Sequence, residues 1–228
     1  MVPDELLQDE RQAAIMALAV PVVLERVCDA YQGLVVLMKG PEAAAHYPST
    51  RLRPFRDLDL LVDDPDQAHR ALRLAGFIDV GDPLRYVGVH HLAPLGWPGL
   101  PLAVELHREL NHPRWLPAPA AHDLFQMTRP SATGANGLRG PVPAAHAVLL
   151  ALHSWAHAPL RRILDLIDVS TSASRSVGRR TGHSRSSWHS AGLWGSSGAR
   201  PSPPLTLYCA IVGEPRRCWC GRAPDDGS

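Results

Sequence analysis

The chain has 228 residues, a formal net charge of +1, 45% hydrophobic residues and 20% charged residues, which is the balance of a globular protein. This composition excludes a collagen-like protein, a disulfide scaffold and a fully disordered chain, and the small net charge gives no global electrostatic case for nucleic acid or an anionic membrane. Since no apolar run approaches the roughly 18 residues of a membrane span, and the acidic N-terminus lacks the basic region of a signal peptide, we expect a cytoplasmic protein without a membrane partner.

Hydrophobic spacing along the first 169 residues predicts helices and strands in alternation. The expected helices cover 4–18, 21–31, 41–46, 63–74, part of 117–127, 144–157 and 160–169. The expected strands cover 34–38, 57–62, 86–95 and 102–107, with a weak hairpin within 129–143. Pro21 is expected to begin the second helix, because proline is tolerated in a first turn. Strands interleaved with helices favour an α/β or α+β fold, with a mixed sheet, flanking helices and a helical C-terminal cap.

The composition changes near residue 170, where the hydrophobic periodicity stops. Twelve of the 15 serines lie in 170–228, together with eight arginines and three acidic residues. The chain has one lysine against 22 arginines, which indicates a GC-rich gene, and such a gene read out of frame yields arginine, serine, glycine and proline. We therefore expect 170–228 to be a frameshift product or an unrelated extension. The alternatives are a natural disordered tail and, third, a basic tail that binds nucleic acid.

The segment Asp57-Leu58-Asp59-Leu60 carries the strongest chemical signal. Because a strand alternates its faces, both aspartates point the same way, and the two leucines point into the core. Two carboxylates on one face repel each other, and a divalent cation such as Mg²⁺, which binds carboxylates together with substrate phosphates, offsets that repulsion. The motif therefore predicts a two-metal platform for phosphoryl chemistry. The alternative is a pair of solvated aspartates at the start of a strand.

Three neighbouring features favour the metal platform over solvated aspartates. Lys39-Gly40 lies between a buried strand and a short helix, where backbone amides and an ammonium group can meet phosphate. The basic side chains just before the aspartates are Arg51, Arg53 and Arg56. These arginines could steady a triphosphate. On a later strand Glu105 and His107 share one face, and Glu105 is a candidate third metal ligand.

Several segments of the chain together resemble one known family. They are Leu37-Met38-Lys39-Gly40, Tyr47-Pro48, Arg53-Pro54, Asp57-Leu58-Asp59-Leu60-Leu61-Val62, Ala68, Leu72, Gly76-Phe77, Val104-Glu105-Leu106-His107, 149–157 and 160–166. This combination is similar to that of an uncharacterised nucleotidyltransferase family within the polymerase-β-like superfamily. The resemblance covers about residues 30–169. It departs from the wider superfamily at Lys39-Gly40, where that superfamily has glycine-serine.

The resemblance implies a nucleotidyltransferase-like fold and the transfer of a nucleoside monophosphate from an NTP to an unknown small-molecule or protein acceptor. The implied catalytic and metal-binding residues, for Mg²⁺ or Mn²⁺, are Asp57, Asp59 and Glu105. The residues themselves, rather than the resemblance, predict phosphate binding by Lys39, Gly40, Arg53 and Arg56, and make His107 a candidate substrate contact. From the resemblance together with the change of composition, we expect a division into N-terminal helices in 1–32, a catalytic core in 33–127, a helical cap in 128–169 and a disordered or frameshifted tail in 170–228. The alternative is a catalytically impaired remnant or binding module that keeps this fold, because the C-terminal part is disrupted.

The histidines outside these motifs admit two interpretations. His153 and His157 lie one turn apart on a helix, and we favour packing or hydrogen bonding to the catalytic core over a direct role in the site. One of His90 and His91 is expected to face the cleft. The acidic residues of the last helix are expected to be solvated or paired with nearby arginines, namely Asp165 and Asp168 with Arg161 and Arg162.

Overall fold

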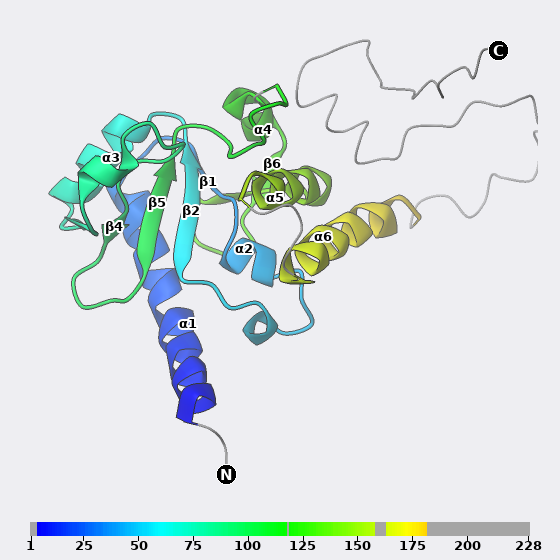
Figure 1. The fold of residues 1–228 in the computed structure, drawn as a ribbon, viewed down its shortest axis with the longest axis horizontal. Helices are drawn as coiled ribbons and strands as arrows, with labels where there is room; N and C mark the ends of the chain where they lie inside the picture. The colour runs from blue at the N-terminus through cyan, green and yellow to red at the C-terminus, as the bar shows by residue number, and fades with distance from the viewer. Residues whose placement is uncertain (1–3, 118, 158–162, 182–228) are drawn as a thin grey trace, which may run out of the picture.

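The computed structural model describes residues 4–117, 119–157 and 163–181 (Figure 1). The helices are α1 (Asp4–Ala30), α2 (Pro41–Ala44), α3 (Pro65–Leu74), α4 (Ala121–Gln126), α5 (Pro143–His157) and α6 (Ile163–Thr181), with 3-10 helices η1 (Thr50–Leu52) and η2 (Pro83–Tyr86). The strands are β1 (Val35–Leu37), β2 (Asp57–Val62), β3 (Ile78–Asp79), β4 (Leu95–Gly96), β5 (Ala103–His107), β6 (Thr128–Pro130) and β7 (Arg139–Pro141). This alternation confirms the α/β class. Within the described residues, no helix is both long and apolar enough to cross a membrane.

The described strands form one seven-stranded mixed sheet in the order β3-β4-β5-β2-β1-β7-β6. The central strand β2 pairs antiparallel with β1 and parallel with β5. The parallel register sets Asp57 opposite Ala103 and Asp59 opposite Glu105. Neighbouring strands lie about 4.8 Å apart. The pairing therefore brings two carboxylates from distant parts of the chain side by side.

The two faces of β2 pack against different helices, as the alternation of its side chains predicts. Leu58 and Leu60 are fully buried in a cluster that includes apolar residues of α1 and α3. On the opposite face Leu61 packs with Met38 and with Leu149 of α5. Figure 1 shows α1 and α3 on one side of the central strands and α5 on the other. Because Asp57 and Asp59 alternate with the first pair of leucines, they lie on the α5 side.

The N-terminal segment forms one helix rather than the two predicted from Pro21. Helix α1 continues through that proline from Asp4 to Ala30. A proline inside a helix costs about 3 kcal/mol, but each fully buried Val or Leu contributes roughly 1.5–3 kcal/mol. Val20 and Leu24, on either side of the proline, are both buried in the core. Packing against the sheet therefore outweighs the lost helical hydrogen bond.

The prediction of a strand at 86–95 is also wrong for most of that segment. Residues up to Tyr86 belong to η2, and only Leu95–Gly96 at the far end joins the sheet as β4. Gly88 has a φ of 76°, outside the range of extended backbone, and this interrupts any strand there. An isolated bridge between His91 and His107 holds the middle of the segment against the end of β5.

Helix α6 continues past residue 170, where the hydrophobic periodicity stops, and ends at Thr181. Its hydroxyl groups bond back to the helix: Thr171 donates to the Ile167 carbonyl at 2.8 Å and Ser174 to the Ser170 carbonyl at 2.8 Å. Polar side chains satisfied in this way are compatible with a helix that hydrophobic spacing does not reveal. The rest of the expected tail, 182–228, lies outside the described residues. The division into 1–32, 33–127 and 128–169 stays a prediction.

Candidate functional site

Asp59 and Glu105 form the centre of the candidate site. Asp59 is 1% exposed, and Glu105, directly across from it on β5, is half-buried. His107 lies two residues further along β5 on the same face, with its Nε2 3.1 Å from Asp59 Oδ1 and 3.8 Å from Glu105 Oε2. Among the described residues, Asp59, Glu105 and His107 form a group whose possible ligand atoms all lie within 4.8 Å of one another. The structure thus brings together three of the residues that the sequence singles out.

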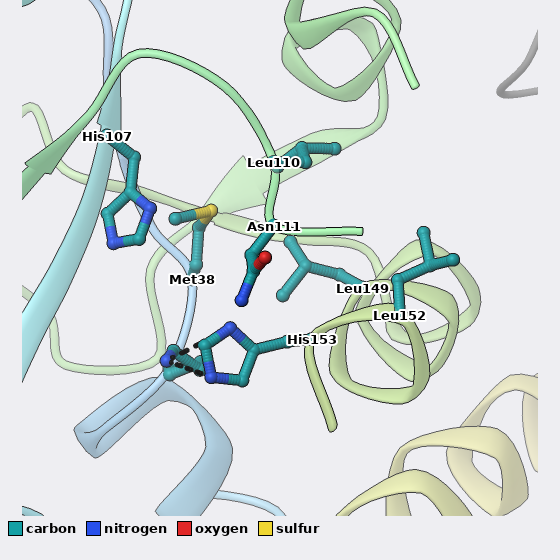
Figure 2. Close-up of a pocket in the computed structure, with 8 residues that line it drawn as sticks. Met38, His107, Leu110, Asn111, Leu149, Leu152 and His153 are labelled. Atoms are coloured by element: carbon teal, nitrogen blue, oxygen red, sulfur yellow. Dashed lines mark hydrogen bonds between the residues drawn. The ribbon is translucent and has the colours of Figure 1, made fainter. Parts of the chain in front are cut away.

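Lys39 supplies the positive charge next to this group. Its Nζ is 2.8 Å from Asp59 Oδ1 and 2.9 Å from His153 Nε2. The backbone fixes this position, because the Met38 amide, at the end of β1, donates to the Asp59 carbonyl at 2.9 Å. Figure 2 shows His153 extending from α5, with its hydrogen bond to Lys39 drawn as a dashed line. His153 therefore makes the hydrogen bond to the core that the sequence analysis favours.

One oxygen of the Asp59 carboxylate is buried without a donor. Oδ1 accepts from both Lys39 and His107, whereas Oδ2 has no hydrogen-bond partner. Burial raises the pKa of Asp59, but the His107 hydrogen bond and the Lys39 charge outweigh burial and hold that pKa well below its usual value. The Asp59 carboxylate is therefore an anion, and its Oδ2 accepts no hydrogen bond. A buried unpaired anionic oxygen is costly, and a divalent cation is a partner that fits it.

The ionised forms of the other two carboxylates, Asp57 and Glu105, are destabilised by their surroundings. Burial, and then the negative charge of Asp59, raise the pKa of Asp57 above its ordinary value. The pKa of Glu105 is raised by the same two causes in the same order, against the opposing effect of His91. Asp57 shares the face of Asp59 but does not belong to the tightest group. Three acids compensated mainly by Lys39 are what a site for a divalent cation requires.

Two histidines present ring nitrogens to this acidic group. Burial lowers the pKa of His107, so its ring is neutral near pH 7. Its Nε2–H donates to Asp59, because a carboxylate can only accept, and its buried Nδ1 has no partner. His91 donates its Nδ1–H to the Leu92 carbonyl at 2.7 Å, with its Nε2 3.8 Å from Glu105 Oε2. His90 instead lies against the His107 ring, with 5.2 Å between the centroids.

Gly40 is required by the backbone beside the site. Its φ is 58°, and a Cβ there would lie 3.1 Å from the Asp57 carbonyl oxygen. Glycine therefore allows the chain to turn from β1 into α2 while it crosses the start of β2. Of the arginines expected at phosphate, Arg56 is exposed. Arg53 is engaged elsewhere, because its guanidinium forms an ion pair with Asp168 of α6 at 2.9 Å.

Asp168 is buried rather than solvated, and among the described residues its charged partner is Arg53. It is 3% exposed, and it accepts from the Tyr47 hydroxyl at 2.5 Å as well as from Arg53. Asp165 accepts from the Ser154 hydroxyl at 2.9 Å. The arginines expected to pair with these acids, at 161 and 162, lie outside the described residues. Burial of Asp168 ties α6 to the loop that leads into β2.

A small pocket opens beside the acidic group (Figure 2). Its lining residues are Met38, Lys39, His107, Leu110, Asn111, Leu149, Leu152 and His153. Asn111 reaches in from the segment after β5, and its side chain lies between those of His107 and His153. Sequence reasoning missed Leu110 and Asn111, because neither belongs to a motif and only the turn after β5 places them against α5.

A mixed sheet that joins carboxylates across parallel strands, beside a lysine and two imidazoles, defines an α/β protein with an acidic site suited to a divalent cation. A family model described as an uncharacterised nucleotidyltransferase matches residues 2–180, and the chain belongs to this family. The sequence motifs cover about residues 30–169. The family match is longer, and it also includes α1 and nearly all of α6. No curated protein and no solved structure matches the chain.

Proposed function

We propose that this protein transfers a nucleoside monophosphate from an NTP to an acceptor hydroxyl or another nucleophile, with a divalent cation at Asp59 and Glu105. The observation that carries the proposal is the ionised, buried Asp59, whose Oδ2 lacks a donor and whose strand register places it against Glu105. Membership of a nucleotidyltransferase family supports the same chemistry. The acceptor would be a small molecule or a protein.

Asp57, Asp59 and Glu105 would hold the cation. When bound, a divalent cation in such a site neutralises triphosphate charge and the charge of the leaving pyrophosphate. Lys39, whose side chain is 14% exposed and lines the pocket, would donate to a phosphate oxygen. His153 accepts from this ammonium and thereby fixes its direction. Gly40 lets the backbone turn beside the phosphate position.

The reaction is a single displacement at the α-phosphorus. The acceptor oxygen forms a bond to that phosphorus, the bond from phosphorus to the pyrophosphate oxygen breaks, and the acceptor proton passes to a carboxylate. Of Asp57 and Glu105, the carboxylate that is not bound to the cation is the candidate base, because burial and the Asp59 charge raise the pKa of each. A carboxylate of raised pKa accepts a proton more readily than an ordinary surface carboxylate.

The first test measures nucleotide binding, because binding needs no knowledge of the acceptor. The full chain is titrated with each NTP, with and without a divalent cation, by isothermal titration calorimetry. We expect cation-dependent binding that Asp59→Asn weakens by about a hundredfold, the effect of removing one buried charged partner. The matched control is Asp66→Asn on α3, whose carboxylate is exposed and pairs with Arg108. This control should bind like the wild type.

The second test measures transfer. NTP labelled at the α-phosphate or at the γ-phosphate is incubated with the protein and a desalted cell extract as the source of acceptors. Nucleotidyl transfer leaves the α-label on an acceptor and releases the γ-label in pyrophosphate. Cation-dependent binding without transfer of the α-label would favour the impaired remnant or binding module. A folded wild-type protein that binds no NTP in any cation would contradict the proposal.

A further inference from the structure

Helix α5 carries a buried histidine that contacts the backbone just before the candidate site. His146 is fully buried, and its Nε2 lies 2.8 Å from the carbonyl oxygen of Met38. A carbonyl can only accept, so the ring proton is on Nε2 and donates to Met38, and the bare Nδ1 accepts from His46 Nε2–H at 2.9 Å. Burial, and then the charge of His46, lower the pKa of His146 to about 3. The ring is therefore neutral at pH 7, and a single tautomer satisfies both contacts.

The carbonyl that His146 holds belongs to the peptide group joining Met38 to Lys39. The Met38 amide donates to the Asp59 carbonyl at 2.9 Å, so Met38 is held by β2 at its N–H and by α5 at its C=O. A peptide group is planar, and fixing its carbonyl fixes the direction in which the chain enters the next residue. His146 thus orients the backbone from which the Lys39 side chain extends.

The same helix also holds the far end of Lys39. His153 follows His146 by seven residues, close to two helical turns, and therefore lies on the same face of α5. Its Nε2 is 2.9 Å from Lys39 Nζ, which in turn is 2.8 Å from Asp59 Oδ1. Between the two histidines, Leu149 packs in one apolar cluster with Met38. One face of α5 therefore fixes the backbone that leads into Lys39 as well as the ammonium of that lysine.

We infer that His146 is a positioning residue for nucleotidyl transfer: it holds the Met38–Lys39 peptide so that the Lys39 ammonium stays beside Asp59 and meets the phosphates of the NTP. The inference rests on the proposed function and adds to it a residue that touches neither the cation nor the nucleotide. The competing account is that the His46–His146 pair only stabilises the packing of α5. The two accounts differ in whether the loss of His146 acts on nucleotide binding through Lys39.

The first test is a double-mutant cycle on the full chain, because such a cycle isolates the coupling between two residues. His146→Leu removes the donor and keeps an apolar side chain in its place, and Lys39→Met removes the ammonium. Isothermal titration calorimetry with an NTP and a divalent cation gives the Kd of the four proteins. We expect His146→Leu to weaken NTP binding about tenfold when Lys39 is present, and less than about twofold in the Lys39→Met background. Equal losses in the two backgrounds would overturn the inference.

A second pair of variants tests the hydrogen bond itself. His146→Gln can place an N–H near the position of the ring Nε2, so it should recover most of the affinity that His146→Leu loses. His122→Leu, at an exposed histidine of α4, is the matched control and should bind NTP like the wild type. If the leucine and glutamine variants at position 146 are equally folded and bind NTP equally, the inference is wrong.

A readout on the wild type decides the matter where His146→Leu does not fold or Lys39→Met binds too weakly to measure. In ¹⁵N spectra of labelled histidine rings, we expect His146 to be neutral with its proton on Nε2, and this resonance to shift when NTP and cation are added. A proton on Nδ1, or a resonance that bound NTP leaves unmoved, would overturn the inference. Failure of the proposed function has a different signature, because the folded wild type would then bind no NTP in any cation.

Discussion

Asp59 and Asp168 are both buried and both paired with a basic side chain, yet their surroundings differ. Asp168 uses both oxygens, because the Tyr47 hydroxyl and two nitrogens of Arg53 donate to them. Asp59 uses one, because Lys39 and His107 both donate to Oδ1 and Oδ2 receives nothing. A carboxylate with both oxygens satisfied holds a fold together, whereas one with an oxygen to spare can take a ligand.

Glu42 supports this distinction from a third position. Its side chain is fully buried, and Arg129, the Ser131 hydroxyl and the Ala132 amide donate to its two oxygens at 2.7–2.9 Å. A Cβ at position 140 would collide with this carboxylate, so Gly140 makes room for it. Glu42 therefore has a structural role, as Asp168 does. Both are buried about as deeply as Asp59, so burial alone does not distinguish the two kinds of carboxylate.

The largest expected effect is the loss of activity in Glu105→Gln. This change removes a charge from the crowded acids and keeps the shape of the side chain. We expect the rate of nucleotidyl transfer to fall about a thousandfold or more, because a lost metal ligand removes several kcal/mol of transition-state stabilisation. Stability should be unchanged or slightly higher, since the variant removes a charge whose burial, and then whose repulsion by Asp59, raise the pKa of Glu105. Transfer assays and urea unfolding on one preparation measure the two quantities.

The matched control on the structural side is Glu42→Gln, which should be unstable rather than merely inactive. A large stability loss in Glu105→Gln would contradict the division between the two kinds of carboxylate. Activity within tenfold of wild type would remove Glu105 from the catalytic set.

The next effect is a loss of stability in Asp168→Asn. The variant keeps the size of the side chain but leaves the Arg53 guanidinium, 14% exposed, without its counter-charge. Breaking such a buried pair costs about 3 kcal/mol. We expect urea unfolding to show this loss, and Arg53→Gln/Asp168→Asn to recover part of it because no unpaired charge remains. If that double variant still binds NTP normally, Arg53 acts in the fold and not at the phosphates.

The sequence predicts the acids of the candidate site, but it does not predict the structural role of Asp168. The sequence predicts Asp57, Asp59 and Glu105 because each lies in a short strand whose alternation is visible in a few consecutive residues. The partner of Asp168 lies 115 positions away and that of Lys39, His153, lies 114 positions away. No local period encodes contacts of that kind, since the packing of α5 and α6 on the sheet creates them. Pro21 shows the same limit, because burial on both sides of it overrides a local signal.

Two buried histidines, His46 and His146, make the stability of the fold depend on pH. His146 donates Nε2–H to the Met38 carbonyl at 2.8 Å, and its Nδ1 accepts from His46 at 2.9 Å. Burial, and then the charge of the partner histidine, lower the pKa of His146 to about 3, and burial followed by arginine charges lowers that of His46 to about 4. The folded pair therefore stays neutral at pH values where the unfolded chain, with pKa values near 6.5, binds protons.

The direction of the pH dependence of stability follows from this difference in pKa between the folded and unfolded chain. Stability from the His46–His146 pair is present in full above about pH 6.5 and is lost as the pH falls toward about 4. Each histidine contributes a slope of up to about 1.4 kcal/mol per pH unit. Urea unfolding at several pH values between these limits should show the decline, and His146→Gln should flatten it. His122→Gln, an exposed change, should leave the slope as it is. A flat wild-type profile would mean that the pair is accessible to protons in the folded state.

The smallest expected effect concerns an ion pair outside the core. Arg108 and Asp66 approach to 3.0 Å, but their side chains are 49% and 56% exposed. Water already solvates both charges, and a pair of this kind contributes about 0.2–1 kcal/mol. Asp66→Asn should therefore lower the free energy of unfolding by less than about 1 kcal/mol, and added salt should abolish the difference. Asp168→Asn should keep most of its larger cost at the same salt concentration, because a buried pair is screened much less than an exposed one. Equal costs for the two variants would mean that burial does not separate these acids, and the assignment of Asp168 to the fold would fail with it.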